Sequence, residues 1–167
     1  MNTGQMMLTI AALLLLSIIV LRVNNSFLST NTAVNQTKYE VMAVSLGTSI
    51  IEQATDKAFD AATIGASVTN LNSLTSPGSL GPETGDAYPD FDDFDDFNGY
   101  TKNTASDATF LSANFTATTV VDYVTPDAPN TNANQRTWHK RLRVTVTSPS
   151  MPDTVRLSTI FSYFYFR

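Results

Sequence analysis

No charged side chain occurs in the first 21 residues of this chain, and this feature constrains its fold more than any other. Residues 6–21 read MMLTIAALLLLSIIVL, in which only Thr9 and Ser17 are polar. As a helix, the uncharged stretch would be about 31 Å long, close to the thickness of the hydrocarbon core of a bilayer. A helix that is apolar on every side is not stable alone in water, so it must lie in lipid or against copies of itself.

A cleaved secretory signal peptide is the first alternative for this segment. No Lys or Arg precedes the apolar run, and the residues that follow it (Arg22-Val23-Asn24-Asn25-Ser26-Phe27) do not form a small-x-small cleavage site. Signal peptides normally have both features. We therefore expect a retained hydrophobic helix that can cross a membrane once.

Apolar residues continue beyond this segment with a helical period. After a polar stretch over residues 24–36 they recur at spacings of three or four, which is typical of one face of an amphipathic helix. The residues of this stripe are Tyr39, Met42, Leu46, Ile50, Ala54, Ala58 and Ala62. No proline occurs before Pro77, so the pattern predicts one helix from residue 6 to about residue 62. Residues 24–36 are rich in poor helix formers, and the sequence leaves open whether the helix melts there.

Residues 63–100 are predicted to form a loop, because they contain Gly-Pro and Pro-Gly steps and many small polar residues. Alternation of period two then predicts three strands, at Asn114–Val124, Arg141–Thr147 and Thr154–Phe166. Consecutive strands with short connections favour an antiparallel sheet. The apolar face of this sheet needs cover, and the stripe on the amphipathic helix is the long apolar surface that can provide it.

The predicted fold class is α+β, with a long amino-terminal helix packed on a small antiparallel sheet. Residues 1–25 are expected to form a projecting hydrophobic helix for a membrane or a filament core. Residues 26–167 are expected to form the head: the amphipathic half of the helix to about residue 62, the loop 63–100 and the sheet within 101–167. The last strand ends in aromatic residues on both faces, so we expect it to be central in the sheet or covered by a neighbour.

Composition excludes several classes of function. The chain of 167 residues has no cysteine and one histidine, His139, which argues against thiolate or histidine metal sites and against a serine-type catalytic triad. Its formal net charge is −5, and nucleic-acid binding needs clustered Lys and Arg. A Gly-rich phosphate loop is also missing. We expect neither an enzyme nor a cofactor, and no nucleic-acid partner.

An acidic and aromatic run, DFDDFDDFNGY, occupies residues 90–100. An EF-hand does not fit it, because with Gly99 at the sixth loop position the first ligand would be Phe94 and the twelfth Ala105. We expect the aromatic residues to anchor the loop on the core while the aspartates stay in water, and we assign no metal site. A calcium site of another kind, built from Asp92, Asp93, Asp95 and Asp96, stays open as the alternative.

Basic and acidic residues are segregated along the chain. Six of the ten basic residues lie in the last 32 positions, whereas seven of the fifteen acidic residues lie between Glu83 and Asp96. The two patches can steer one subunit against another, or they can be solvated or pair within one head. The sequence leaves both interpretations open.

An uncharged apolar helix at the amino terminus that continues into an amphipathic half packed on an antiparallel sheet resembles the type IV pilins and pseudopilins. In that family a prepilin peptidase cuts behind a glycine, and the apolar helices bundle into the core of a filament. The resemblance implies Gly4 as the cleavage position and Gln5 as the first mature residue. Thr9 then stands at the fifth mature position, where family members normally have a glutamate, so the resemblance supports fold and assembly more than processing.

Two functions follow from the resemblance. The first is a structural subunit of an extracellular type IV pilus-like filament at the cell surface, which polymerises with itself and lies in the inner membrane before the pilus assembly machinery acts on it. The second is a membrane-anchored minor pseudopilin-like or adhesion component that forms no filament. A filament core needs polar contacts among its packed helices, and Gln5, Thr9 and Ser17 are the candidates for these contacts.

Overall fold

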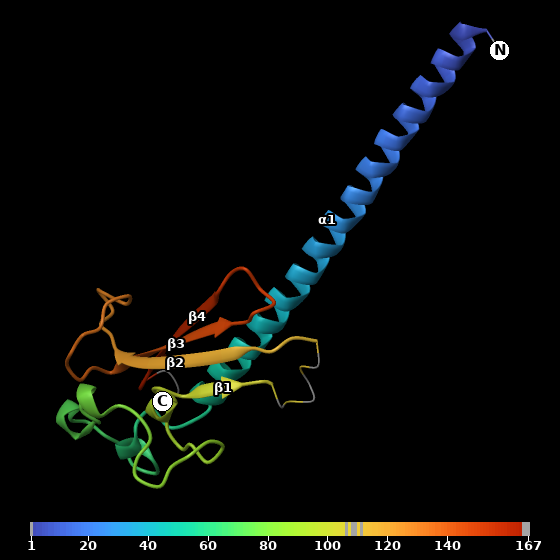
Figure 1. Cartoon of the computed structure of the whole chain (residues 1–167). Coiled ribbons are helices and arrows are strands. Elements are labelled where there is room, and N and C mark those ends of the chain that lie inside the picture. Colours follow the sequence, from blue (N-terminus) through green and yellow to red (C-terminus); the bar gives the residue numbers. More distant parts are fainter. Residues whose placement is uncertain (1, 106, 108–109, 111, 165–167) are drawn as a thin grey trace. The chain divides into compact units, whose positions relative to one another are not determined.

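The computed structural model describes residues 2–105, 107, 110 and 112–164. The fold is α+β, as predicted: a long helix packs on an antiparallel sheet (Figure 1). The described elements are α1 (Thr3–Thr55), η1 (Ala61–Thr63), η2 (Leu71–Ser73), η3 (Pro77–Ser79), η4 (Asp95–Phe97), β1 (Thr101–Asn103), β2 (Thr116–Tyr123), β3 (His139–Thr147) and β4 (Val155–Ser162). The chain divides into two compact units, residues 1–38 and residues 39–167, and the second is called the head below.

Helix α1 is unbroken through the polar stretch at residues 24–36. Hydroxyl groups in this part of the helix donate to carbonyl oxygens four residues earlier, from Thr30 Oγ1 to Ser26 O at 2.9 Å and from Thr32 Oγ1 to Leu28 O at 3.0 Å. These bonds satisfy the hydroxyl hydrogens within the helix itself. The question that the sequence left open is thus answered in favour of a continuous helix.

The helix ends at Thr55, seven residues before the predicted end, so that part of the prediction is wrong. Beyond it, the backbone of Ala58 leaves the helical path and pairs with the acidic run. Its N–H donates to the carbonyl oxygen of Asp92 at 3.2 Å, and its own carbonyl oxygen accepts from the N–H of Phe94 at 2.9 Å. A residue that makes this bridge cannot also continue the helical ladder, which explains why periodicity alone extended the helix too far.

The four strands pair in the order β1-β2-β3-β4, all antiparallel. The three predicted strands are confirmed as β2, β3 and β4. One end, Thr147, agrees and the others differ by one to a few residues; positions 165 and 166 of the third strand lie outside the described residues. Strand β1 has only three residues, too few to show an alternating pattern. We expected the last strand to be central in the sheet or covered by a neighbour. Because β4 lies at the edge of the described sheet, the first alternative is wrong, and the second stays a prediction.

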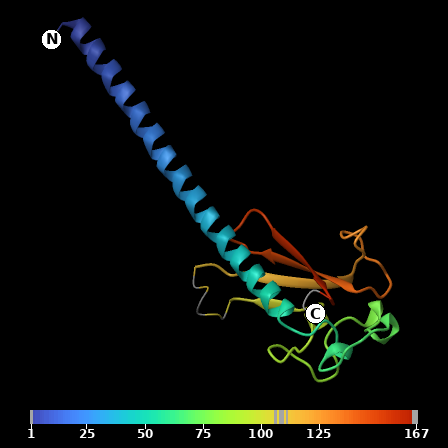
Figure 2. The same cartoon turned by 180° about the vertical axis from the view of Figure 1, so that it is seen from behind.

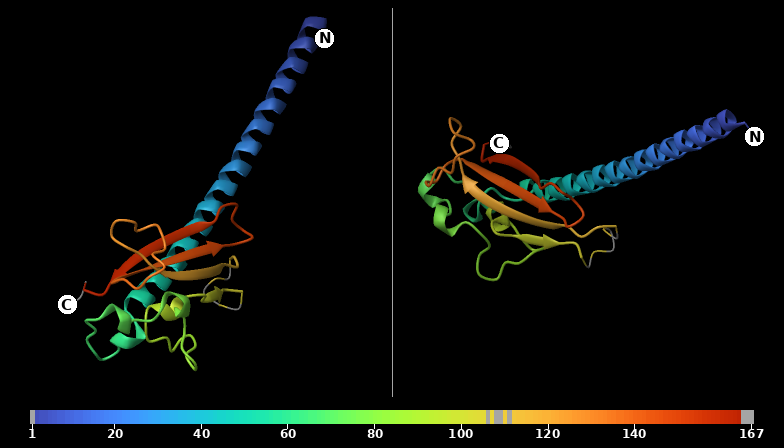
Figure 3. Two further views of the ribbon diagram at one scale, coloured as in Figure 1. Left: turned by 90° about the vertical axis from the view of Figure 1, so that its left-hand side faces the viewer. Right: turned by 45° about the horizontal axis from the view of Figure 1, so that its top comes forward.

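Residues 39–55 of α1 lie along one face of the sheet (Figures 2 and 3). The predicted apolar stripe is confirmed there, since Leu46, Ile50 and Ala54 are buried. Helix and sheet approach closely at Gly47, where an added Cβ would lie 2.7 Å from Leu157 Cδ1 and 3.5 Å from a methyl carbon of Val146. The core of the head therefore forms between the second part of α1 and the inner face of β2, β3 and β4.

The segment between α1 and β1 closes one end of this core. Phe91, Phe94 and Phe97 are buried, as predicted for aromatic anchors of the acidic run. Their rings contact neighbours at typical aromatic distances, with centroids 5.1 Å apart for Phe91 and Phe97 and 5.2 Å apart for Phe94 and Phe161. Anchoring every third residue holds the intervening aspartates close to the core as well.

Candidate functional site

Large apolar side chains cover the helix of the first unit, and every described residue from Asn2 to Asn35 is exposed. Each large apolar residue from Met6 to Leu28 is at least 48% exposed. Burial of one such side chain contributes roughly 1.5–3 kcal/mol, so this surface requires lipid or protein around it. We call it the apolar helix surface; it consists of Met6, Met7, Leu8, Ile10, Leu13, Leu14, Leu15, Leu16, Ile18, Ile19, Val20, Leu21, Val23, Phe27 and Leu28.

The residues predicted for cleavage and polar contacts all lie on this exposed helix. Gln5 and Thr9 are one turn apart, and the Thr9 hydroxyl donates to Met6 O at 2.9 Å. The Ser17 hydroxyl donates to Leu13 O, also at 2.9 Å. An added Cβ on Gly4 would meet nothing within 4 Å. Because each hydroxyl oxygen keeps a free lone pair, Thr9 and Ser17 can accept a hydrogen bond from a packed neighbour, while the roles of these residues stay predictions.

By length and composition, α1 is able to cross a membrane, which makes it compatible with membrane insertion. Comparisons of the chain with protein-family models, with curated proteins and with solved structures found no match.

A buried lysine is the centre of a second cluster, in the head. The side chain of Lys140, from β3, is fully buried, and its ammonium donates to Phe59 O at 2.8 Å and to Asp60 Oδ2 at 2.8 Å. It also donates to Asp95 Oδ1, from η4. The ammonium nitrogen lies 4.7 Å from the centroid of the Phe59 ring. All three N–H groups of the ammonium are thus used, and the ion pairs join segments 45 and 80 residues apart in sequence.

Asp60 and Asp95 respond differently to the same burial. Burial alone raises the pKa of Asp60, but the Lys140 charge and hydrogen bonds from Lys140, Thr75 N–H and Ala62 N–H outweigh it and hold this pKa below its ordinary value. For Asp95, burial is the stronger effect and raises its pKa, although the Lys140 ammonium opposes the change. Asp60 is also the N-cap of η1, where its Oδ1 accepts a hydrogen bond from the Ala62 N–H. This bond fixes the position of the Asp60 carboxylate.

The prediction that the aspartates of the acidic run stay in water is wrong for Asp93, Asp95 and Asp96, which are fully buried, although Asp90 and Asp92 are exposed. Asp93 Oδ1 accepts the N–H groups of Asp95 and Asp96, at 2.7 and 3.2 Å. Asp96 Oδ2 in turn accepts the N–H groups of Asp92 and Asp93, at 2.9 and 3.2 Å. Carboxylates of the run thus accept hydrogen bonds from N–H groups of the same run, as Asp side chains do when they cap turns.

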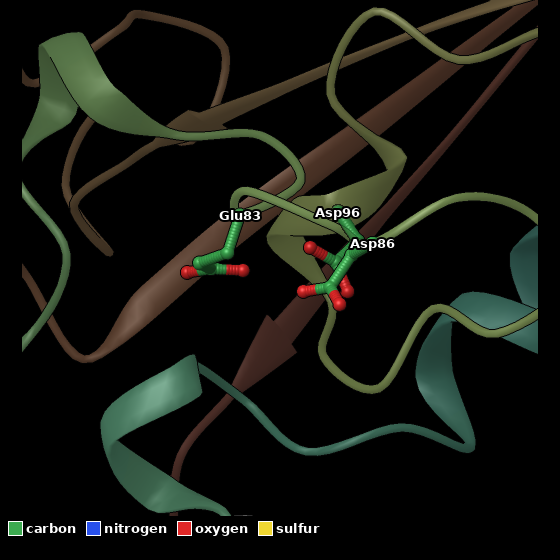
Figure 4. Close-up of side chains that lie close together, drawn as sticks. All are labelled: Glu83, Asp86 and Asp96. Carbon is green, nitrogen blue, oxygen red and sulfur yellow. The ribbon is translucent and has the colours of Figure 1, made fainter.

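A third cluster joins the acidic run to the loop before it. Glu83, Asp86 and Asp96 each place one carboxylate oxygen within 4.8 Å of the others (Figure 4). The first two residues sit on a tight turn in which Asp86 N donates to Glu83 O at 3.1 Å, and Gly85 between them has a φ of +112°, which side chains rarely adopt. Loss of hydration, with the charges of Asp93 and Asp96, raises the pKa of Glu83 to about 7.

The sequence did not bring Glu83 and Asp86 into this cluster, because they lie in a predicted loop and approach Asp96 only through the fold. It also did not predict the burial of Lys140, which stands at the start of an alternating strand among other basic residues. The only available signals were the density of aspartates at 90–96 and a lysine on the parity of the strand that faces the core. Neither signal indicates that Lys140 pairs with a carboxylate 45 or more residues away.

Opposite charges also pair on the other face of the sheet. Arg141 Nε donates to Asp122 Oδ1 at 3.0 Å, and Arg143 Nη2 lies 3.3 Å from Asp122 Oδ2. Of the two interpretations of charge segregation, pairing between the two patches within one head is observed for Lys140 with Asp95, whereas Arg141 and Arg143 pair with Asp122, which lies outside the acidic patch. Arg167, another member of the basic group, lies outside the described residues.

Proposed function

We propose that this chain is a structural subunit of an extracellular, type IV pilus-like filament that polymerises through its amino-terminal helix. The observation that carries the proposal is the apolar helix surface, which is exposed on every side along the described residues of the first unit. Surfaces of this size on one helix are found where lipid or other copies of the helix cover them.

The length of the apolar segment suits both environments. Residues 3–21 of α1 span about 28 Å at 1.5 Å per residue, which matches the hydrocarbon core of a membrane before assembly. In a filament the same surfaces would pack helix against helix. Because the contact between identical subunits would join different patches, it would not close into a ring and would propagate as a helical polymer.

Polar atoms on this helix support specific packing over mere anchoring. Without a hydrophobic driving force between helices in lipid, association depends on close packing and on interhelical hydrogen bonds. Thr9 and Ser17 carry free acceptor lone pairs within an otherwise apolar surface, and Gln5 adds an amide near the start of the helix. The family resemblance implies two further partners. A prepilin peptidase would cleave the chain behind Gly4, and a pilus assembly machinery would add the subunit to the filament.

Electron microscopy of material sheared from cells that express the chain tests the proposal, with mass spectrometry of the subunit in the same sample. We expect filaments composed of this chain, with Gln5 as the amino-terminal residue. A chain that stays in the membrane fraction without filaments would contradict the proposal and favour the membrane-anchored minor component.

Cross-linking through introduced cysteines distinguishes the two functions more sharply, because the natural chain has none. Because a heterologous contact joins different positions of the two helices, each of four variants that sample the successive faces of the helix is coexpressed in turn with copies that carry one cysteine elsewhere between residues 5 and 24. The four variants are Leu13→Cys, Leu14→Cys, Leu15→Cys and Leu16→Cys. In the sheared fraction we expect disulfide-linked dimers for the faces that meet a neighbouring helix. The control, Asp153→Cys, places its thiol in the exposed β3–β4 connection of the head. Dimers at none of the four helix positions would refute helix-mediated assembly.

A further inference from the structure

Three carboxylates from two separate segments converge in the head at the cluster of Glu83, Asp86 and Asp96. Figure 4 shows the Asp96 carboxylate facing those of the other two residues. The tight turn at residues 83–86 presents two of them together, and the acidic run presents the third. One oxygen of each lies within 4.8 Å of the others, so a single ion can contact all three.

A second and independent observation concerns the hydrogen bonds of Asp96. This residue is fully buried, and its Oδ2 is held by the N–H groups of Asp92 and Asp93. Its Oδ1 is also buried but has no hydrogen-bond partner among the described residues. A buried carboxylate oxygen without a donor is costly, so an ion or an ordered water is expected at such an atom. Asp93 Oδ2 and Asp95 Oδ2, which lie outside the cluster, also have no hydrogen-bond partner among the described residues.

Protein side chains do not supply the missing positive charge. Among the described residues, no ion pair joins a lysine or arginine to Glu83, Asp86 or Asp96. The buried ammonium of Lys140 is already fully used by Phe59, Asp60 and Asp95. Three ionised carboxylates this close repel one another, and either a bound cation or a proton on one of them relieves the repulsion.

We propose that Glu83, Asp86 and Asp96 bind a calcium ion in the head of this protein. The ligands are all carboxylate oxygens, which hard cations prefer, and the cluster contains no nitrogen or sulfur ligand for a softer metal. Oxygens on opposite sides of Ca²⁺ lie up to about 5 Å apart, whereas around Mg²⁺ they lie up to about 4.2 Å apart. The three oxygens lie within 4.8 Å of one another, which is inside the range that Ca²⁺ spans, and three carboxylates exceed the one or two that usually hold Mg²⁺.

The site is open to water on one side, since Glu83 is exposed and Asp86 is half-buried. Water molecules can therefore complete the six to eight oxygens that Ca²⁺ takes, and the ion has a path of entry. Binding would fasten the 83–86 turn to the acidic run, which itself packs on the core through its aromatic residues. With three side-chain ligands and the rest water, we expect a dissociation constant of about 10 µM to 1 mM. This inference does not depend on the proposed filament.

Calorimetric titration of the full chain tests the proposal, after chelation, in a non-ionic detergent. We expect one equivalent of Ca²⁺ to bind, and 10 mM CaCl₂ to raise the melting temperature of the head by about 4–20 °C over this range of dissociation constants. No binding heat together with an unchanged melting temperature would refute the proposal. An equal response to MgCl₂ at the same concentration would refute the assignment to calcium.

Paired variants separate a cation site from an acidic cluster with a purely structural role. Glu83→Gln with Asp86→Asn removes two charges at the surface, and Asp96→Asn removes the third while it keeps an acceptor for the backbone N–H groups. We expect each to weaken Ca²⁺ binding at least tenfold and to abolish the calcium-dependent shift, with a melting temperature in EDTA equal to or above that of the wild type. The control, Asp90→Asn, removes an exposed charge from the same run and should bind like the wild type. Equal loss in the control would show that general negative charge, and not this site, attracts the ion.

Discussion

Replacement of Lys140 by methionine is the change that best tests the polar core of the head. Three hydrogen bonds of the ammonium would disappear, and the carboxylates of Asp60 and Asp95 would stay buried without their cation. Methionine fills most of the lysine volume, so the cavity contributes little. Removal of one partner from a buried ion pair costs about 3–5 kcal/mol, and we expect Lys140→Met to lower the free energy of unfolding by that amount.

The single tryptophan makes this measurement specific to the head. Trp138 precedes β3 and stacks on Tyr163 with ring centroids 5.3 Å apart, so its fluorescence reports urea unfolding of the head in the full, detergent-solubilised chain. A second substitution, Asp95→Asn in the Lys140→Met background, should restore part of the loss because it removes one unpaired charge. Lys102→Met serves as the control, since the partly exposed Lys102 should change the free energy of unfolding by less than about 0.5 kcal/mol.

The loss in the free energy of unfolding caused by Lys140→Met should become smaller as the pH falls. Lys140 lowers the pKa of Asp95 against the effect of burial, so its removal lets the pKa rise further. The folded variant then binds this proton at a higher pH than the folded wild type, whose Asp95 has a pKa of about 8, so the stability of the variant relative to the wild type improves as the pH falls from about 10 to 7. A loss below about 1 kcal/mol, or no recovery with Asp95→Asn, would refute the view that the ion pair stabilises the head.

Three further outcomes are expected from the same fluorescence assay. Gly47→Val should lower the free energy of unfolding by about 1–3 kcal/mol, because its side chain would clash with Leu157 at the helix–sheet contact. Arg141→Lys should lower it by about 1–2 kcal/mol, because lysine cannot reproduce the two-pronged pairing with Asp122. In calcium-free buffer the wild type should become more stable as the pH falls from 8 to 6, because the pKa of Glu83, about 7 when folded, is raised above its value of 4.5 and the folded chain binds more protons there.

Each of these expectations has a matched control. Thr48→Val places the same side chain at an exposed neighbouring position of α1 and should be nearly neutral, whereas a loss equal to that of Gly47→Val would show that the loss does not require the contact with Leu157. Arg156→Lys changes an exposed arginine of β4 and should also be neutral. Glu83→Gln should reduce the change in the free energy of unfolding between pH 8 and pH 6. An unchanged pH dependence would show that other titratable groups cause it.

Local patterns in the sequence were sufficient for most of the secondary structure. The stripe that includes Leu46, Ile50 and Ala54 predicted the buried face of α1, and alternation predicted β2, β3 and β4. The end of the helix could not be predicted in this way, because it depends on a bridge between Ala58 and a segment more than thirty residues later. The edge position of β4 likewise depends on strand order, which alternation does not encode.

The sequence by itself determined that the amino-terminal helix carries no charged side chain over 21 residues, which makes it apolar on every side and compatible with membrane insertion. It also determined the α+β class, since periods of 3.6 and 2 follow from backbone geometry alone. Only the tertiary structure decided where the charges of the head lie. Lys140 meets Asp60 and Asp95, and Glu83 and Asp86 meet Asp96, across separations that no local pattern spans. Burial of a charge depends on which distant partner can compensate it, and that is settled only when the chain has folded.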